Sequence, residues 1–219
     1  GIATKRLAFE EAFLLLGVMA KRRFDASARP ATARIPSGTL RARFDARLPF
    51  TLTAGQEEIG ATISRDLAQP PPMHRLLQGE VGSGKTIVAL RAMLDVVDAG
   101  GQCVLLAPTE VLAQQHYRTL RSMLGPLGAR GELDGDADGT EVVLLTGSSN
   151  TAQRKAAMLA MASGAAGITV GTHALLEDRV QFADLGLIVI DEQHRFGVEQ
   201  RASLGGKARD GAVPHVLVM

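Results

Sequence analysis

Short apolar runs alternate with longer amphipathic stretches along most of the chain. The apolar runs are rich in Val, Ile and Leu, which is typical of strands that are covered on both faces. The stretches between them repeat apolar residues at helical spacing, and glycines follow several of them. The pattern predicts strands near residues 75–78, 102–107, 141–145, 167–170, 187–190 and 215–218, and helices over 53–68, 85–99, 110–124, 151–163 and 196–204.

This alternation predicts an α/β domain, with a mostly parallel sheet that carries helices on both faces. A helical leader over residues 1–47 is expected before it, with a helix near 4–24, a break over 26–38 and a short helix that ends near 47. Such a leader is too small for a core of its own, so it is expected to pack against a neighbouring domain outside this chain. The division is therefore leader 1–47 and α/β lobe 48–219.

The leader is basic. Residues 1–50 carry ten Lys or Arg against four Asp or Glu, although the whole chain of 219 residues has a net charge of only +1. A basic segment can lie near nucleic-acid phosphates, or it can be a solvated amphipathic linker. Charge alone leaves both interpretations open.

Composition excludes several classes of protein. The single cysteine, Cys103, begins an apolar run, which indicates a reduced core residue without a disulfide partner. The apolar run over 13–20 is too short to cross a membrane and is flanked by charges. The sequence therefore predicts a cytoplasmic protein without membrane contact.

A phosphate-binding loop follows the first predicted strand and precedes a predicted helix. Its glycines allow successive N–H groups to point at one phosphate, and the helix N-terminus adds partial positive charge. Lysine in this motif reaches the β- and γ-phosphates, and the following hydroxyl binds Mg²⁺. The loop consists of Gly79, Glu80, Val81, Gly82, Ser83, Gly84, Lys85 and Thr86.

A carboxylate site completes this pattern. The apolar run over 187–190 ends in Asp191 and Glu192. An aspartate at the end of a buried parallel strand can hold Mg²⁺, and the adjacent glutamate can activate a water molecule. Together the two motifs predict binding of a nucleoside triphosphate with Mg²⁺.

Small and hydroxyl residues follow three other predicted strands. Their backbone N–H and side-chain O–H groups can approach a phosphodiester without reading its sequence. Loops after strands are rich in such residues anyway, so the prediction of nucleic-acid contact depends on three of them sharing one edge. These candidates are Pro108, Thr109, Glu110, Thr146, Gly147, Gly171, Thr172 and His173.

Several of these motifs occur in one order that resembles the RecG family of superfamily-two DNA helicases. The similarity covers the first motor lobe, from about residue 48 to residue 219, and part of the leader before it. The segments that carry it are 48–56, 79–86, 107–116, 170–175 and 191–201. The resemblance implies a RecA-like P-loop fold with ATP and Mg²⁺ as cofactors.

The resemblance also implies roles for single residues. Gln56 would read adenine and Phe50 would pack near the base, although core packing is the alternative for Phe50. Lys85, Asp191 and Glu192 would form the catalytic set, with Thr86 beside Asp191 at the metal. His194 would couple the nucleotide site to DNA, and the alternative is a purely structural histidine.

Branched or duplex DNA is the partner that the resemblance implies. A fork-recognising wedge domain and a second motor lobe with an arginine finger are not contained in these 219 residues, so the isolated chain is expected to hydrolyse ATP very slowly. The implied activity is ATP-dependent remodelling of branched DNA such as stalled replication forks. The alternatives are a transcription-repair coupling or primosomal translocase, an unrelated P-loop kinase or ATPase, and a nucleotide-gated binding module without turnover.

Overall fold

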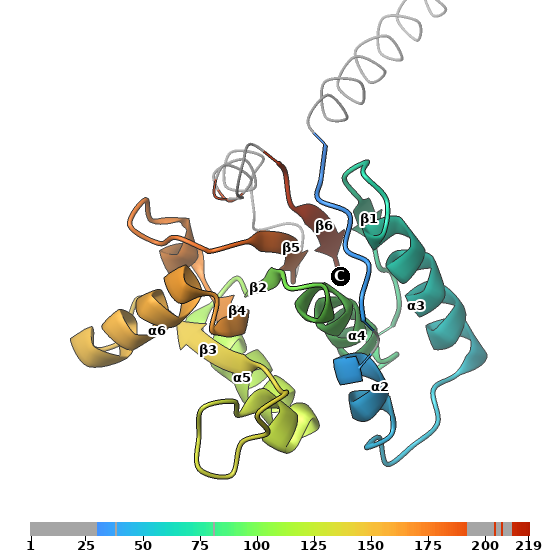
Figure 1. Ribbon diagram of the computed structural model, residues 1–219, viewed down its shortest axis with the longest axis horizontal. Coiled ribbons are helices and arrows are strands. Elements are labelled where there is room, and N and C mark those ends of the chain that lie inside the picture. The colour runs from blue at the N-terminus through green and yellow to red at the C-terminus, as the bar shows by residue number, and fades with distance from the viewer. Residues whose placement is uncertain (1–29, 38, 81, 192–203, 205–206, 208–211) are drawn as a thin grey trace, which may run out of the picture.

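The computed structural model describes residues 30–37, 39–80, 82–191, 204, 207 and 212–219 (Figure 1). The helix expected near 4–24 lies outside these residues. So does the helix expected over 196–204, apart from its last position.

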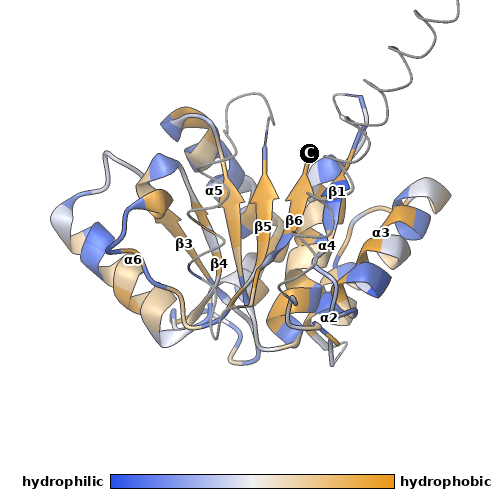
Figure 2. Cartoon of the chain, turned by 90° about the horizontal axis from the view of Figure 1, so that it is seen from above, coloured by the Kyte–Doolittle hydropathy of each residue, from blue (hydrophilic) through white to orange (hydrophobic). Residues whose placement is uncertain are grey.

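The described strands form one parallel sheet. Its order is β1-β6-β5-β2-β4-β3, and every neighbouring pair is parallel. Figure 2 shows the arrowheads of the strands at one edge. The strands predicted from the sequence are all confirmed, as β1 (His74–Leu76), β2 (Gln102–Leu106), β3 (Glu141–Leu145), β4 (Ala166–Gly171), β5 (Leu185–Ile190) and β6 (His215–Val218).

Three of the described α-helices begin at a side-chain cap from the residue before them. Thr53 and Asn150 each form a capping box, and the Thr109 hydroxyl accepts from the Leu112 amide. The short 3-10 helices η1 (Gly125–Gly128) and η2 (His173–Leu176) were not predicted. The α-helices are α2 (Thr39–Asp45), α3 (Ala54–Leu67), α4 (Lys85–Asp98), α5 (Glu110–Leu124) and α6 (Thr151–Ser163), as expected apart from small shifts at their ends.

Two apolar layers form the core, one on each face of the sheet. Leu105 and Val189 pack in the layer beneath α2, α3, α4 and α5. Their neighbours Val104 and Ile188 pack in the layer beneath α6. Successive residues of β2 and β5 thus serve opposite faces, as the pleat of a strand requires. This arrangement confirms the predicted α/β class with helices on both faces.

The short helix α2 packs on this core, although residues up to 47 were assigned to a leader. Leu40 and Phe44 are buried in the same apolar layer as α4. The Asp98 carboxylate accepts from the backbone amides of Leu40 and Arg41 and so caps the start of α2. Residues 39–45 are therefore part of the packed lobe.

A second part of the expected leader crosses the amino ends of the central strands. The Arg34 guanidinium donates two 2.6 Å hydrogen bonds to the Asp184 carboxylate, and Arg34 is almost fully buried. A Cβ atom on Gly101 or Gly186 would meet this guanidinium within 3 Å, so these glycines leave it room. The boundary expected at residue 48 thus falls inside the packed unit, and the role of residues 1–29 stays a prediction.

Cys103 is buried in β2, as predicted for a core residue, and burial raises the pKa of its thiol strongly. Among the described helices, none combines the length and the apolar character that a bilayer span requires.

His215 connects the start of β6 to two earlier segments of the chain, one before α2 and one before β1. Its Nδ1 accepts from the Met73 amide at 3.0 Å, and its Nε2 lies 3.3 Å from the Thr32 carbonyl oxygen. The acceptor role of Nδ1 requires the neutral ring. Burial lowers the pKa of His215, and the nearby charges of Arg34 and His74 lower it further, against the opposite effects of the Thr32 carbonyl and Asp66.

A pH dependence of stability follows. Because the folded-state pKa lies below the ordinary value, the unfolded chain binds more protons in this range, so stability falls as the pH decreases through about 6.5. His215→Asn keeps an acceptor near Nδ1 but does not titrate. We expect the variant to be less stable at neutral pH but to lose less stability between about pH 8 and pH 5. Chemical denaturation at several pH values measures this, and parallel pH curves for the two proteins would contradict it.

Candidate nucleotide and nucleic-acid site

The carboxyl edge of the sheet gathers the predicted motifs. The loop over 77–84 connects β1 to α4, and Asp191 follows β5. Only β6 lies between β1 and β5 in the sheet. In parallel sheets, ligands bind outside the carboxyl ends of the strands. The two halves of the predicted nucleotide site therefore share one edge.

Glycines shape the phosphate-binding loop for specific reasons. Gly82 and Gly84 adopt φ values of 84° and 82°, in the left-handed region that glycine tolerates best. A Cβ atom on Gly84 would also collide with the Gln56 amide nitrogen. Gly84 is thus required both for its own backbone angle and for contact between the loop and α3.

Lys85 is the first residue of α4 and turns back over the loop. Its Nζ donates to the carbonyl oxygens of Gly79 and Glu80 at 2.7 and 3.1 Å. The ammonium group is therefore held at the mouth of the loop by weak neutral acceptors. Thr86 follows in the first turn of the helix, and Val81 lies outside the described residues.

Gln56 makes two contacts that were not predicted. Its Oε1 accepts from the Thr53 amide at 3.0 Å, which closes the capping box of α3. Its Nε2 donates to the Ser83 carbonyl oxygen at 3.0 Å. A primary amide has two N–H groups and two lone pairs, so one of each is left after these bonds. Gln56 both starts α3 and ties it to the loop.

Phe50 lies a few residues before Gln56. The residue is 53% exposed, so the alternative interpretation as a core residue is wrong. An exposed aromatic face can pack against a flat ring.

Asp191 is fixed by two hydrogen bonds. Its backbone amide donates to the Leu106 carbonyl oxygen at 2.9 Å, and its Oδ2 lies 2.6 Å from His116 Nε2. The predicted Glu192 and His194 lie outside the described residues. No cluster of three potential metal ligands occurs among the described residues. A Mg²⁺ ion needs only one or two carboxylates beside phosphate oxygens and water, so Asp191 and Thr86 fit such a site.

No role was predicted for His116, because a single histidine within a helix is not by itself a sign of function. The position of its helix in the chain does give a sign of function. Helix α5 begins at Glu110, four residues after the end of β2, so its first turns lie at the same edge of the sheet as Asp191.

The three groups of nucleic-acid candidates form one rim at this edge. They follow β2, β3 and β4, which are neighbours in the sheet. The Glu110 Oε1 atom accepts from the Ser148 amide at 3.0 Å and so joins the β2 end to the β3 end. Hydrogen bonds from Ser148 and from the Gly147 amide, with the nearby charge of His173, lower the pKa of Glu110. Glu110 is thus an organiser of the rim.

Exposure separates the rim candidates into two groups. Thr109, Gly147 and His173 are exposed, whereas Pro108 and Glu110 are half-buried. The remaining candidates are buried: Thr146, Gly171 and Thr172. The exposed three are the ones that can meet a large partner directly. The Thr109 hydroxyl accepts from the Leu112 amide and its carbonyl oxygen accepts from the Ala113 amide, so both oxygens already serve the start of α5.

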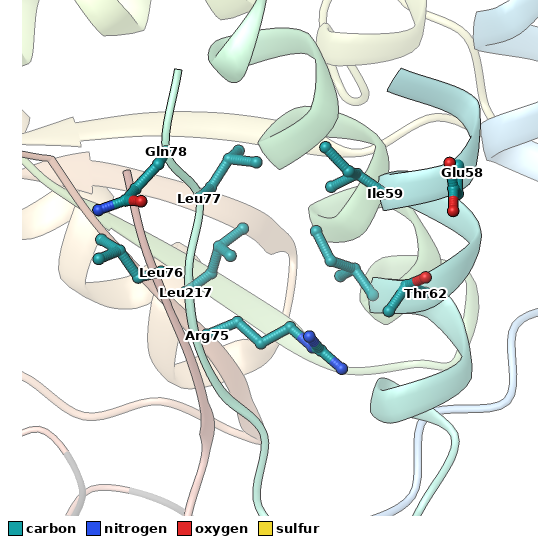
Figure 3. Close-up of a pocket in the computed structure, with 9 residues that line it drawn as sticks. Glu58, Ile59, Thr62, Arg75, Leu76, Leu77, Gln78 and Leu217 are labelled. Carbon is teal, nitrogen blue, oxygen red and sulfur yellow. The ribbon is translucent and has the colours of Figure 1, made fainter. Parts of the chain in front are cut away.

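A pocket of about 420 Å³ lies beside the loop, between α3 and the edge strand β1. Figure 3 shows Ile59 and Thr62 of α3 on one wall and Leu76 and Gln78 on the other. It is a separate hollow with a mixed apolar and polar lining, and none of the predicted site residues lines it.

Comparison with known proteins gives the same family from sequence and from structure. The model of the DEAD/DEAH box helicase family matches residues 53–213. The ATP-dependent DNA helicase RecG of Mycobacterium tuberculosis is 54% identical over 218 residues, which is 99% of this chain and 30% of that protein. RecG of Synechocystis is 44% identical over 219 residues, or 25% of its length. The chain thus spans about a third or less of these relatives.

Solved structures extend the likeness. A structure of RecG bound to a three-way DNA junction superposes with a TM-score of 0.81 and 35% identity, over 98% of this chain and 27% of that one. The yeast DEAD-box splicing factor Prp28 gives a TM-score of 0.59 at 19% identity, which is a likeness of fold alone. The resemblance to RecG inferred from the sequence is confirmed.

Proposed function

This chain belongs to the DEAD/DEAH box helicase family, and we propose that it is the first motor lobe of an ATP-dependent helicase that remodels branched DNA. It would bind ATP and help to couple hydrolysis to movement on duplex DNA. The wedge domain, the second motor lobe and a cytoplasmic location remain predictions from the resemblance to RecG.

One observation carries the nucleotide part of the proposal. The loop of Lys85 and the carboxylate of Asp191 lie at the same edge of the sheet, with one strand between them. The loop leads directly into the N-terminus of α4, which carries a partial positive charge. No ordinary structural need explains a glycine-rich loop, a lysine and a strand-end aspartate together.

The residues suit ATP with Mg²⁺. Phosphate oxygens are stronger acceptors for Lys85 than the neutral carbonyls of Gly79 and Glu80 that it meets now. Thr86 and Asp191 would hold Mg²⁺, and the remaining amide valences of Gln56 would meet adenine, with Phe50 beside the ring. The ion supplies charge that stabilises the transferring phosphoryl group. Glu192, at the next position after Asp191, would orient the attacking water.

The DNA part rests on the rim and on the relatives. The structure of RecG has been solved bound to a three-way DNA junction. The match to it covers 98% of this chain and 27% of that RecG chain. Exposed Thr109, Gly147 and His173 follow three neighbouring strands beside the nucleotide site. Backbone amides and small side chains contact phosphates without sequence readout, which suits a translocase. His194 would couple the two sites.

Two alternatives differ in what they predict. A transcription-repair coupling or primosomal translocase would use the same nucleotide site, but the 54% identity to RecG favours RecG. A nucleotide-gated binding module would bind ATP without turnover in any polypeptide that contains this lobe. DNA-stimulated ATPase activity of the longer protein distinguishes that module from a motor.

Lys85→Ala should abolish measurable binding of Mg·ATP, because it removes the mobile cation at the mouth of the loop. Isothermal titration measures the affinity. Lys155→Ala, which removes an exposed lysine of α6, is the matched control and should bind as the unaltered chain does. Unchanged affinity in Lys85→Ala would refute the phosphate site.

Gln56 should give the site a preference for ATP over GTP. A buried amide that loses its partner costs about 1–3 kcal/mol, which corresponds to about tenfold to a hundredfold in affinity. Both Gln56→Ala and Gln56→Glu should lose most of the preference. Both variants lose the bond to the Ser83 carbonyl oxygen, but Gln56→Ala should lower the melting temperature more, because glutamate at this position still closes a capping box. Equal affinities for ATP and GTP in the unaltered chain would contradict adenine recognition.

The rim should contact DNA phosphates. His173→Glu places a negative charge among the exposed rim groups, so we expect several-fold weaker binding of branched duplex DNA at low salt and a smaller difference at high salt. Ala162→Glu is the control. It adds the same charge at the end of α6, near the opposite edge of the sheet. Fluorescence anisotropy with a labelled junction measures both, and equal losses in the two variants would remove the rim from the proposal.

A further inference from the structure

His116 approaches Asp191 from outside the sheet. Their Nε2 and Oδ2 atoms are 2.6 Å apart, and the two side chains are 15% and 20% exposed. A carboxylate that binds a metal ion is ionised and can only accept, so in that state the shared proton lies on Nε2 of the histidine. A short hydrogen bond to an ionised acceptor is among the stronger ones available to a side chain.

The backbone around this pair leaves it little freedom. Helix α5 begins four residues after Leu106, the last residue of β2. The amide of Asp191 donates to the carbonyl oxygen of that same Leu106. Both partners are therefore anchored at the end of one strand, and the side-chain hydrogen bond closes a compact loop of contacts.

The packing of α5 also fixes the histidine. Ala113, Leu120 and Leu124 form the buried stripe of the helix. His116 lies three residues after the first of them and four before the second, so it belongs to the same stripe. The ring is thus turned toward the sheet edge by the helix that carries it.

We propose that His116 is a positioning residue for the metal-binding carboxylate. Its hydrogen bond engages Oδ2 and restrains the rotation of the Asp191 carboxylate, and the second oxygen would be left to hold the ion. Hydrogen bonds to metal-binding carboxylates serve this purpose in many proteins, and losing one typically weakens metal binding or activity by about 10–100-fold. The inference rests on the proposed function, because it needs Asp191 to bind Mg²⁺.

A purely structural histidine is the alternative, and two substitutions separate it from positioning. His116→Phe keeps a planar ring of similar size but cannot donate. His116→Gln has no ring, but its amide can reach the position of Nε2 and donate to Oδ2. The exposed neighbour Gln115→Ala serves as the control on the same helix.

The experiment titrates ATP binding to the full chain at a series of MgCl₂ concentrations, and separately in EDTA. We expect His116→Phe to raise the Mg²⁺ concentration for half-maximal binding about 10–100-fold, with unchanged affinity for metal-free ATP. His116→Gln and Gln115→Ala should stay close to the unaltered chain. His116→Ala removes the same hydrogen bond without adding a ring and must move the midpoint in the same direction, which keeps the test valid if the phenylalanine packs poorly.

Three results would overturn the inference. The first is an unchanged Mg²⁺ midpoint in both His116→Phe and His116→Ala. The second is an equal change in His116→Gln, which would make ring packing the cause. The third is a parallel loss of metal-free binding and melting temperature, which would indicate a structural role. If the unaltered chain binds ATP without any dependence on Mg²⁺, the metal site of the proposed function fails together with this inference, and the Lys85→Ala result then shows whether the phosphate site stands.

Discussion

Burial of helix α4 on all sides is the constraint on which the rest of the lobe depends. Every residue from Ile87 to Val96 is buried. Two of them are charged, and each has partners on the covering elements. Arg91 donates to Asp45 of α2, and Asp95 accepts from Arg41 of α2 and from Ser64 of α3. A buried charge without a partner would be strongly destabilising, so these contacts determine where α2 and α3 lie.

This arrangement has a direct consequence for the proposed nucleotide site. Because α4 cannot shift without breaking its ion pairs, its N-terminus is held at the carboxyl edge of the sheet. Gln56 at the start of α3 then bonds to Ser83 in the loop. The phosphate-binding loop is therefore restrained by two helices: α4, into which it leads, and α3, which contacts it through Gln56. Preorganised binding groups lose less entropy when a ligand arrives.

The repeated strands and helices could be predicted because their signals are local. The apolar run over 187–190 and the capping residue Thr109 identify their elements without knowledge of the rest of the chain. The contacts of Arg34 and His116 could not be predicted in this way. Arg34 meets Asp184 across 150 positions of sequence and His116 meets Asp191 across 75, and neither pairing has a periodic signature.

The same distinction explains why residues 39–45 pack on the lobe although they were expected in a leader. A short basic segment with a break before it is typical of a linker, and composition alone gives no reason to place it in the core. Leu40 and Phe44 are the two buried residues of α2, which is a weak pattern over seven residues. The position of α2 follows instead from Asp98 and Asp95 on α4, whose carboxylates accept hydrogen bonds from the start of α2. Hydrogen bonds to these two aspartates, which sequence periodicity does not reveal, decided this part of the fold.

Strand β5 illustrates how such long-range pairings serve the site. Before its first residue, Asp184 accepts two hydrogen bonds from Arg34, and after its last residue Asp191 meets His116. The Arg34 Nε atom is buried without a partner, which costs about 1–3 kcal/mol. The bidentate pair and the room left by Gly101 and Gly186 offset that cost. Burying an arginine is costly, but its two parallel N–H groups fix both the position and the direction of the Asp184 carboxylate.

The strand that carries the predicted metal-binding aspartate is thus restrained at both ends by side chains from outside the sheet, in addition to its ladders with β2 and β6. Sub-ångström placement of a catalytic carboxylate needs this kind of support, and the ladders alone restrain only the backbone.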